Sequence, residues 1–139
     1  MKTELDYIEL KKVKKVNLIK EAKLPDKYVA DDQGNVYIHN KTLPKKTIDG
    51  KLHIVVKKMK PYKTKLGYME YVLTNKNGIK KHLQVHRIVA TLFIPNKKKL
   101  PHVNHKDGDR SNNTVTNLEW SSISDNIKHS YKYLRGKKK

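Results

Sequence analysis

Residues 103–130 read VNHKDGDRSNNTVTNLEWSSISDNIKHS, and this stretch decides the fold that we expect for the C-terminal part of the chain. It begins as a short strand, turns at the Asp-Gly pair 107–108 and reaches a second strand near residues 118–120. A helix is expected next, with Ser122 or Ser124 as its N-cap residue. The apolar residues that recur at helical spacing there are Ile123, Ile127, Tyr131 and Leu134. The stretch therefore predicts strand, turn, strand and helix.

The preceding residues should supply the core for this small unit, because so short a stretch buries too little surface to fold alone. Residues 67–84 hold an Asn-Gly pair between two β-prone runs, which predicts a hairpin. Residues 85–93 then place apolar side chains at the spacing of one helix face, and Pro95 prevents the helix from continuing. His86 and Arg87 fall off this apolar face. We expect them to point toward solvent or toward the C-terminal segment.

The N-terminal part is expected to contain a helix and a small sheet. No Gly or Pro interrupts residues 5–22, and their apolar residues fit helical spacing in part, so we predict a helix there. Residues 27–38 read KYVADDQGNVYI, where the Gly-Asn pair predicts a turn between two strands. Residues 41–51 predict an exposed connection, and LHIVV at 52–56 has the β-branched content of a strand. The chain is therefore predicted to be an α+β protein, with a small antiparallel sheet and a helix before the C-terminal unit.

Positive charge dominates the composition, with a formal net charge of +19 at pH 7 over 139 residues. Hydrophobic residues make up 36% and charged residues 32%, which indicates a small core under a heavily charged surface. A polyanionic partner explains the imbalance, because each Lys or Arg placed on a phosphate releases a condensed counterion. We expect nucleic acid as that partner, and an anionic membrane surface is the alternative.

The chain contains no cysteine, which excludes disulfides and thiolate metal sites and fits a reducing compartment. Its first residues, MKTELDYIELKKVKK, contain no uninterrupted apolar segment of the kind found in signal peptides. No apolar run elsewhere approaches the length that spans a membrane. We therefore expect a soluble, cytoplasmic protein without a membrane partner.

Residues of the C-terminal stretch have the chemistry for hydrolysing a phosphodiester bond with a single cation. Asn104 and Asn126 offer carbonyl oxygens, which suit a hard divalent cation such as Mg²⁺. His105 titrates near neutrality, so its neutral form can take a proton from water. The cation would offset charge on the phosphate and the leaving oxygen. Structural zinc on His102, His105 and His129 is the alternative, but a strand does not place residues i and i+3 on one side.

Residues 85–94, VHRIVATLFI, and residues 103–130 together resemble the HNH nuclease family. The resemblance is closest to the phage and intron-encoded homing endonucleases with the ββα-metal (His-Me finger) fold, and it covers about a third of the chain. It implies an endonuclease that nicks or cuts DNA and leaves 5′-phosphate and 3′-hydroxyl ends. It also implies one divalent cation per site, with Mg²⁺ expected and Mn²⁺ or another ion as the alternative.

The same resemblance implies a role for each motif residue. His105 would be the general base, and Asn104 and Asn126 would bind the metal. Asn117 would brace the loop that orients the base. The first metal ligand in homing relatives is often Asp, so Asn104 leaves the site without a charged ligand from the motif, and the substrate phosphate would supply the missing charge. His129 is the alternative final residue of the motif, or a contact to the phosphate.

Residues 27–38 are also similar to the small N-terminal module that often precedes HNH domains in phage nucleases, although its usual Trp is absent. The chain is therefore divided into an accessory DNA-binding region at 1–51 and a nuclease domain at 52–135. The ββα-metal core of that domain is expected at about 85–134, and residues 136–139 form a basic tail.

Lysines concentrated around the predicted hairpin, opposed there only by Glu70, predict a surface that follows the DNA backbone without reading its sequence. The expected contacts are Lys57, Lys58, Lys60, Lys63, Lys65, Lys80 and Lys81. His86 and Arg87 are candidate contacts to phosphate or metal, with a solvated helix face as the alternative. Arg87 suits a phosphate because its guanidinium grips two oxygens at once.

Two other functions stay open at this point. A protein that retains the nuclease fold and binds DNA without cutting it is one, for which the uncharged Asn104 is the reason. An RNA-binding or RNA-cleaving protein is the other, because charge does not distinguish the two polymers. Duplex DNA is the expected partner of either a monomer or a dimer. Only one motif is present, so a double-strand break would need two sites or two visits.

Overall fold

The computed structural model describes residues 6–19 and 22–125, which form three antiparallel sheets and the helix α1 (Val85–Phe93). The first sheet contains β1 (Asp6–Glu9), β2 (Val13–Lys15), β3 (Tyr28–Asp31), β4 (Val36–His39), β5 (Lys46–Ile48) and β6 (Lys51–Lys58). The others contain β7 (Tyr62–Lys63), β8 (Met69–Thr74) and β9 (Lys80–Gln84), and β10 (His102–His105) with β11 (Leu118–Ser121). The short 3-10 helices are η1 (Leu10–Lys12), η2 (Val16–Leu18) and η4 (Val115–Asn117). The predicted α+β class is confirmed.

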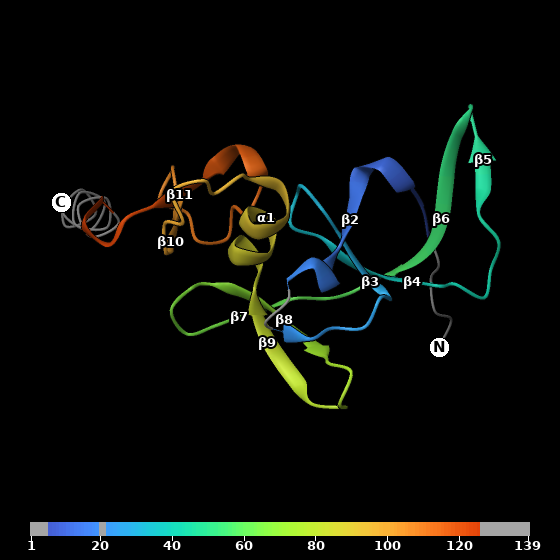
Figure 1. Cartoon of the computed structure of the whole chain (residues 1–139), viewed down its shortest axis with the longest axis horizontal. Coiled ribbons are helices and arrows are strands. Elements are labelled where there is room, and N and C mark those ends of the chain that lie inside the picture. The colour runs from blue at the N-terminus through green and yellow to red at the C-terminus, as the bar shows by residue number, and fades with distance from the viewer. Residues whose placement is uncertain (1–5, 20–21, 126–139) are drawn as a thin grey trace.

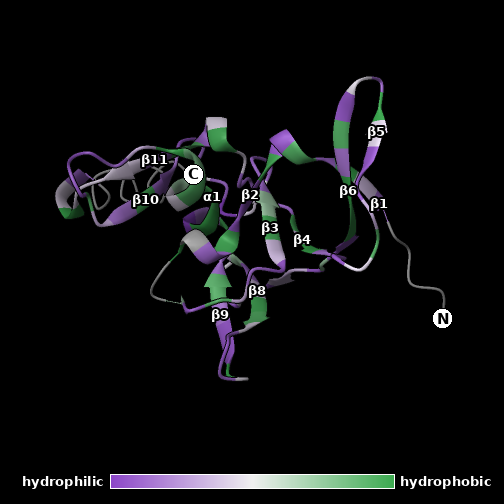
Figure 2. Ribbon diagram, turned by 45° about the vertical axis from the view of Figure 1, so that its right-hand side comes forward, coloured by the Kyte–Doolittle hydropathy of each residue, from purple (hydrophilic) through white to green (hydrophobic). Residues whose placement is uncertain are grey.

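The N-terminal sheet and the β10–β11 pair lie at opposite ends of the described structure (Figure 1). The N-terminal sheet runs in the order β1-β6-β4-β3-β2, with β5 pairing only with β6. In both Figure 1 and Figure 2, α1 and the β8–β9 hairpin lie between this sheet and the β10–β11 pair. Because α1 lies in the centre, both the N-terminal sheet and the β10–β11 pair pack against it.

The prediction of a helix over residues 5–22 is wrong. This part of the chain contributes β1 and β2 to the N-terminal sheet, where Ile8 lies opposite Ile54 and Val13 lies opposite Asp31. The partial helical spacing competes with β-branched side chains, which pack well on a pleated sheet. Pairing with strands far along the chain therefore outweighs the local helical pattern.

The predicted strand pair at 27–38 is confirmed as β3 and β4, and the strand predicted at 52–56 lies within β6. The segment 41–51 is largely exposed, as predicted, but it is not only a connection. Its β5 strand pairs with the start of β6 through a turn at Asp49 and Gly50, both with positive φ. Figure 1 shows this β5–β6 hairpin at the edge of the N-terminal sheet.

The hairpin predicted within 67–84 is confirmed as β8 and β9. Its turn is organised by Asn75, whose Oδ1 accepts bonds from the backbone N–H groups of Asn77 and Ile79, each at 2.9 Å. Gly78 has φ +80°, a conformation that costs glycine little. Figure 2 shows a hydrophilic outer part of β9 before the chain enters α1.

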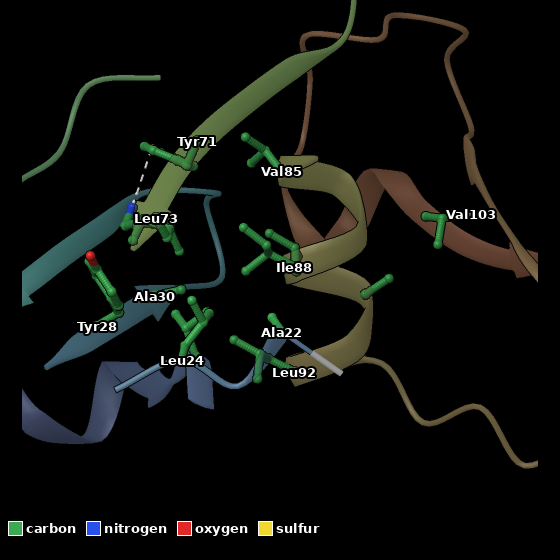
Figure 3. Close-up of a cluster of buried hydrophobic side chains, with 14 of the residues drawn as sticks. Ala22, Leu24, Tyr28, Ala30, Tyr71, Leu73, Val85, Ile88, Leu92 and Val103 are labelled. Atoms are coloured by element: carbon green, nitrogen blue, oxygen red, sulfur yellow. Dashed lines mark hydrogen bonds between the residues drawn. The ribbon is translucent and has the colours of Figure 1, made fainter. Parts of the chain in front are cut away.

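The predicted helix at 85–93 is confirmed, with the expected apolar face buried in the main core. Figure 3 shows how that core joins elements from the whole described structure. Its labelled residues are Ala22, Leu24, Tyr28, Ala30, Tyr71, Leu73, Val85, Ile88, Leu92 and Val103. A smaller cluster on the N-terminal sheet contains Val13, Val29, Tyr37, Ile54 and Val56. The N-terminal sheet and the C-terminal segment thus share one core through α1.

Two close contacts attach the β3–β4 turn to the C-terminal segment. The backbone N–H of Val115 donates to the carbonyl of Asp32 at 2.8 Å. A Cβ placed on Gly34, which has φ +88°, would lie 3.0 Å from Val85 Cγ1 and 3.3 Å from Asn113 Cβ. Only glycine lets this turn come so close, so the N-terminal sheet directly supports the loop before β11. Across residues 6–19 and 22–125, no helix has the length and apolar character needed to cross a membrane.

Candidate functional site

The antiparallel pair β10 and β11 places the predicted motif residues beside each other. In its register Asn104 lies opposite Glu119, and His105 lies opposite Leu118. Val103 and Leu118 are buried in the main core, which anchors the pair against α1. A helical turn begins after β11, where Ser122 Oγ accepts a bond from the backbone N–H of Asp125 at 3.1 Å. Ser122 is thus the N-cap residue of this turn.

Asn117 fastens the loop between the two strands through its side chain. Its Nδ2 donates to Asp107 Oδ1 at 2.9 Å and to the carbonyl of Asn112 at 2.8 Å. Its Oδ1 accepts from the backbone N–H of Asp107 at 3.1 Å. Bonds from Asn112 and from the backbone of the loop hold the pKa of Asp107 below its usual range. These contacts are those expected of a loop brace, and the effect of Asn117 on catalysis stays a prediction.

His105 is buried at the end of β10, and its Nε2 lies 2.8 Å from Asn113 Oδ1. Because an amide oxygen only accepts, this bond assigns the ring proton to Nε2 and leaves the lone pair on Nδ1. Burial lowers the pKa of His105, and the bond to Asn113 opposes that shift. The ring is therefore neutral at pH 7, the form that can take a proton.

A stack of side chains packs against His105 from α1 and the segment before β8. The His86 ring lies 4.9 Å from the His105 ring and 5.2 Å from the Tyr68 ring, measured between centroids. The Arg110 guanidinium carbon lies 4.6 Å from the centroid of Tyr68, on the outer side of the stack. Arg110 also donates to the carbonyl of Leu66. The stack holds the His105 ring in place and presents a cation at its edge.

His86 points toward the C-terminal segment, which is one of the two directions predicted for it. Only 6% of its surface is exposed, and its Nδ1 has no hydrogen-bond partner. Burial is the main cause that lowers the pKa of His86 to about 3, with smaller contributions from the nearby His105 and Arg87. The His86 ring is therefore neutral, so it can pack against His105 but has no positive charge to attract a phosphate.

Arg87 lies on a different side of α1 from this stack. Its Nη1 donates to the carbonyl of Pro101 at 3.1 Å, and its guanidinium lies 5.7 Å from the ring centroid of Trp120. Trp120 packs against the main core and donates its Nε1–H to the carbonyl of Ile94 at 3.0 Å. These contacts hold the Arg87 side chain near the start of β10. Its contact with phosphate stays a prediction.

Asn104 is 7% exposed, and its Nδ2 donates to Glu119 Oε1 at 3.2 Å. The oxygen atoms of these two side chains are hard donors of the kind that Mg²⁺ prefers, so the donor chemistry fits the predicted cation. Within residues 6–19 and 22–125, no three His, Cys, Asp or Glu side chains cluster closely enough to hold an ion. The other predicted residues of the motif, Asn126 and His129, lie outside the described residues.

The predicted lysine surface divides into groups at different distances from His105. Lys63 ends β7 and Lys65 lies in the following turn next to Arg110, and Lys63 is close enough to influence the pKa of Asp109. Lys80 and Lys81 begin β9, at the far end of the hairpin from α1 (Figure 1). The others, Lys57, Lys58 and Lys60, are exposed at and after the end of β6. All are placed on the surface except Lys81, which is half-buried.

The sequence-based interpretation missed several residues of this site. Asn113 lies in an Asn-Asn pair and Tyr68 lies just before β8, and the sequence alone indicates no role in the site for either. Glu119 and Arg110 carried no local signal. All of them reach His105 or Asn104, or the stack beside them, through contacts between elements, which spacing along the chain does not encode.

The sequence and the fold of this chain are similar to those of known HNH endonucleases. Residues 83–128 match the family model described as HNH endonuclease. Over 55 residues the chain is 49% identical to an uncharacterised HNH endonuclease, L245, of Acanthamoeba polyphaga mimivirus, which covers 40% of this chain and 17% of that protein. It is 41% identical over 54 residues to the DNA endonuclease I-HmuI of Bacillus phage SP01, covering 39% of this chain and 31% of that one.

The whole fold is similar to a solved structure, described as DNA binding and cleavage by the HNH homing endonuclease I-HmuI. The TM-score is 0.60 at 28% identity, and the match covers 92% of this chain and 59% of that chain. The matches thus span less than two thirds of the length of each of these relatives. Together the matches confirm the resemblance drawn from the motif. The part of the chain that matches the HNH endonuclease family model is therefore residues 83–128.

Proposed function

We propose that this protein is a DNA endonuclease that hydrolyses phosphodiester bonds with a divalent cation, Mg²⁺ in the first instance, and with His105 as general base. The observation that carries the proposal is the buried, neutral His105, held through Nε2 by Asn113 beside the oxygen donor Asn104. The similar protein I-HmuI, whose structure is described in terms of DNA binding and cleavage, supports DNA as the substrate.

In this proposal His105 takes a proton from water at Nδ1 while Asn113 keeps its ring oriented. The resulting hydroxide attacks the phosphorus, the bond from phosphorus to the 3′ oxygen breaks, and the departing oxygen takes up a proton from solvent water. The products are a 5′-phosphate and a 3′-hydroxyl. Asn104, with Asn126 from the following segment, would hold one cation, whose charge would stabilise the phosphate and the departing oxygen.

The DNA backbone would lie along the exposed cations next to the stack. Arg110 is held at its edge by the Tyr68 ring and the carbonyl of Leu66, with Lys63 before the turn that contains Leu66 and Lys65 within it. We assign residues 1–51 to an accessory DNA-binding region, residues 52–135 to the nuclease and residues 136–139 to a basic tail. Because β6 belongs to the N-terminal sheet and the main core is shared, this division concerns function and not separate folding.

Plasmid DNA incubated with the full chain tests the proposal. We expect nicked or linear product with Mg²⁺ or Mn²⁺, no product with EDTA, and ends that a ligase accepts because they carry 5′-phosphate and 3′-hydroxyl groups. Product that forms equally well in EDTA would contradict the role of the cation. Parallel reactions on duplex DNA, single-stranded DNA and RNA test the choice of polymer, for which we expect duplex DNA to be cut fastest.

A second function has one observation in its favour. Asn104 is uncharged, so a protein that binds DNA without cutting it fits the same fold. Binding to duplex DNA without cleavage across a series of divalent cations would select this function. Replacing Lys63 and Lys65 with Gln should lower the slope of log affinity against log salt by about 1 for each lost phosphate contact, for an enzyme and a binder alike. The more distant Lys80 and Lys81 provide the comparison.

A further inference from the structure

Glu119 lies directly opposite Asn104 in the β10–β11 pair, and its Oε1 accepts a hydrogen bond from Asn104 Nδ2 at 3.2 Å. Directly opposed residues on neighbouring antiparallel strands have their Cβ atoms close together, so the backbone register itself brings these side chains into reach. Asn104 is buried, which confines its amide to few orientations. The backbone pairing of β10 with β11 and the burial of Asn104 therefore fix the relative position of these two side chains.

An ionised carboxylate accepts hydrogen bonds and donates none. The amide of Asn104 can satisfy Glu119 only with its NH₂ end, and this turns Oδ1 to the other side. An asparagine without such a partner can present either end, and half of the choices would aim N–H groups at a cation. Glu119 thus fixes the orientation of the Asn104 amide, and with it the direction of Oδ1, the only atom of this side chain that can bind a metal.

We propose that Glu119 is a positioning residue of the metal site, which holds the Asn104 amide with Oδ1 turned toward the cation. The inference rests on the proposed function, because it assumes that Asn104 binds the metal. It also accounts for an uncharged residue at the first ligand position. The negative charge near the metal would be carried by Glu119, which lies opposite Asn104 on the neighbouring strand β11. Groups that orient a metal ligand in this way commonly affect metal affinity by roughly ten- to a hundredfold.

Two other roles for Glu119 predict different results. As a direct ligand, it would contribute to metal affinity even without Asn104. As a purely structural cross-strand partner, it would contribute to stability and leave metal affinity unchanged. A double-mutant cycle separates the three roles, because residues that act through one another show non-additive effects.

The test uses the full ¹⁵N-labelled chain and follows Mn²⁺ binding by paramagnetic broadening of amide signals around residues 103–106. The variants are Glu119→Gln, Asn104→Ala and both together, with Glu70→Gln as a control that removes a carboxylate from another strand. Thermal unfolding of each variant shows whether it is folded. Glu119→Gln keeps the size of the side chain while losing the acceptor-only character that selects the amide orientation.

We expect Glu119→Gln to weaken Mn²⁺ binding by roughly tenfold, Glu70→Gln to leave it unchanged, and Glu119→Gln to have no further effect when Asn104 is already Ala. Additive losses in the double variant would overturn the positioning role in favour of a direct ligand. Unchanged affinity in Glu119→Gln would reduce Glu119 to a structural partner. If the unsubstituted chain shows no local broadening, the positioning role of Glu119 fails, whereas the proposed function is decided separately by plasmid cleavage with Mg²⁺ and with EDTA.

Discussion

The N-terminal sheet and the loop between β10 and β11 are held together by different forces. In the sheet, β-branched residues such as Ile54 and Val56 are fully buried, and burial of apolar surface supplies roughly 25 cal/mol per Å². In the loop, the buried residues include Asn113, Asn117 and His105, which are satisfied by hydrogen bonds. Such bonds each contribute only about 1 kcal/mol net, but leaving one buried partner unpaired costs about 1–3 kcal/mol.

This difference shows that the N-terminal sheet contributes mainly stability, whereas the loop between β10 and β11 fixes the positions of the site's side chains. Apolar burial is non-directional, so the buried cluster of the sheet adds stability without orienting any one polar side chain. Amide hydrogen bonds are directional, so the loop fixes His105 and Asp107 with little net gain in stability. The variants below should separate the two, with stability losses greatest in the sheet and activity losses greatest in the loop.

The largest stability loss is expected for Ile54→Ala in β6. Removing this fully buried side chain leaves a cavity in the sheet cluster, and we expect the free energy of unfolding to fall by about 3–4 kcal/mol. Leu52→Ala is the control, because Leu52 belongs to the same strand and is 41% exposed. Urea titration measures both, and DNA cleavage per folded molecule should stay unchanged. Equal losses in the two variants would show that the buried cluster does not stabilise the sheet.

Acid should weaken the packing around His105 through His86. The pKa of His86 is about 3 in the folded protein against 6.5 for the free side chain, so below pH 6.5 the unfolded chain takes up a proton that the folded one resists. The stability is therefore present above pH 6.5 and is lost as the pH falls toward 3. Between pH 7 and pH 4 this group alone should cost about 3 kcal/mol.

Urea titrations at both pH values compare the unsubstituted chain with His86→Leu, which fills the same space without titrating. The variant should lose about 3 kcal/mol less on acidification, and His82→Leu, at an exposed position on β9, should behave like the unsubstituted chain. An identical acid response in His86→Leu would mean that His86 is not buried in its neutral form.

Asn117→Ala should reduce stability moderately and cleavage severely. It removes both donor bonds and the acceptor for the Asp107 N–H, at a cost of roughly 2 kcal/mol, and frees the loop that follows His105. We expect cleavage to fall by at least about a hundredfold, the usual contribution of a positioned base. Asn96→Ala removes similar amide bonds from the connector before β10 and should leave the cleavage rate intact. A similar rate loss in both would indicate general loosening.

The smallest stability effect is expected for Gly34→Ala, which links the two regions. Its positive φ is unfavourable for alanine and its new Cβ would meet Val85 and Asn113, so we expect a loss of about 1–2 kcal/mol and slower cleavage. Gly50→Ala is a matched control, since Gly50 also has positive φ but no atom within 4 Å of the added Cβ. A larger stability loss in Gly34→Ala than in Gly50→Ala, with slower cleavage only in Gly34→Ala, would support the contact. Unchanged cleavage in both would contradict it.

Local signals predicted the elements that local chemistry determines. The Asn-Gly and Gly-Asn pairs identified two hairpins, and the spacing from Val85 to Phe93 identified α1, because turn preferences and helical period act over a few residues. The segment 5–22 was wrongly predicted as a helix because its partners, β3 and β6, are distant in sequence. Its own residues carry no information about which strands they will meet.

The same distinction holds within the site. His105, Asn104 and Asn117 were predictable as candidates from the motif spacing, and their roles stay predictions; the structure places Asn104 and His105 as the last two residues of β10. Their partners Asn113 and Glu119 were not, because a loop bond and a cross-strand register create those contacts. Packing of the stacked Tyr68 and His86 rings against His105 depends on how α1 packs against the segment before β8, which no local pattern records.

The most direct test of the central claim is the single-turnover rate of duplex DNA cleavage by the unsubstituted chain and by His105→Ala, at saturating protein with Mg²⁺. We predict a fall of roughly a hundred- to ten-thousandfold for His105→Ala, with thermal unfolding still cooperative and DNA affinity retained, and no change for His82→Ala. Equal cleavage rates in His105→Ala and the unsubstituted chain would contradict the claim that His105 is the base.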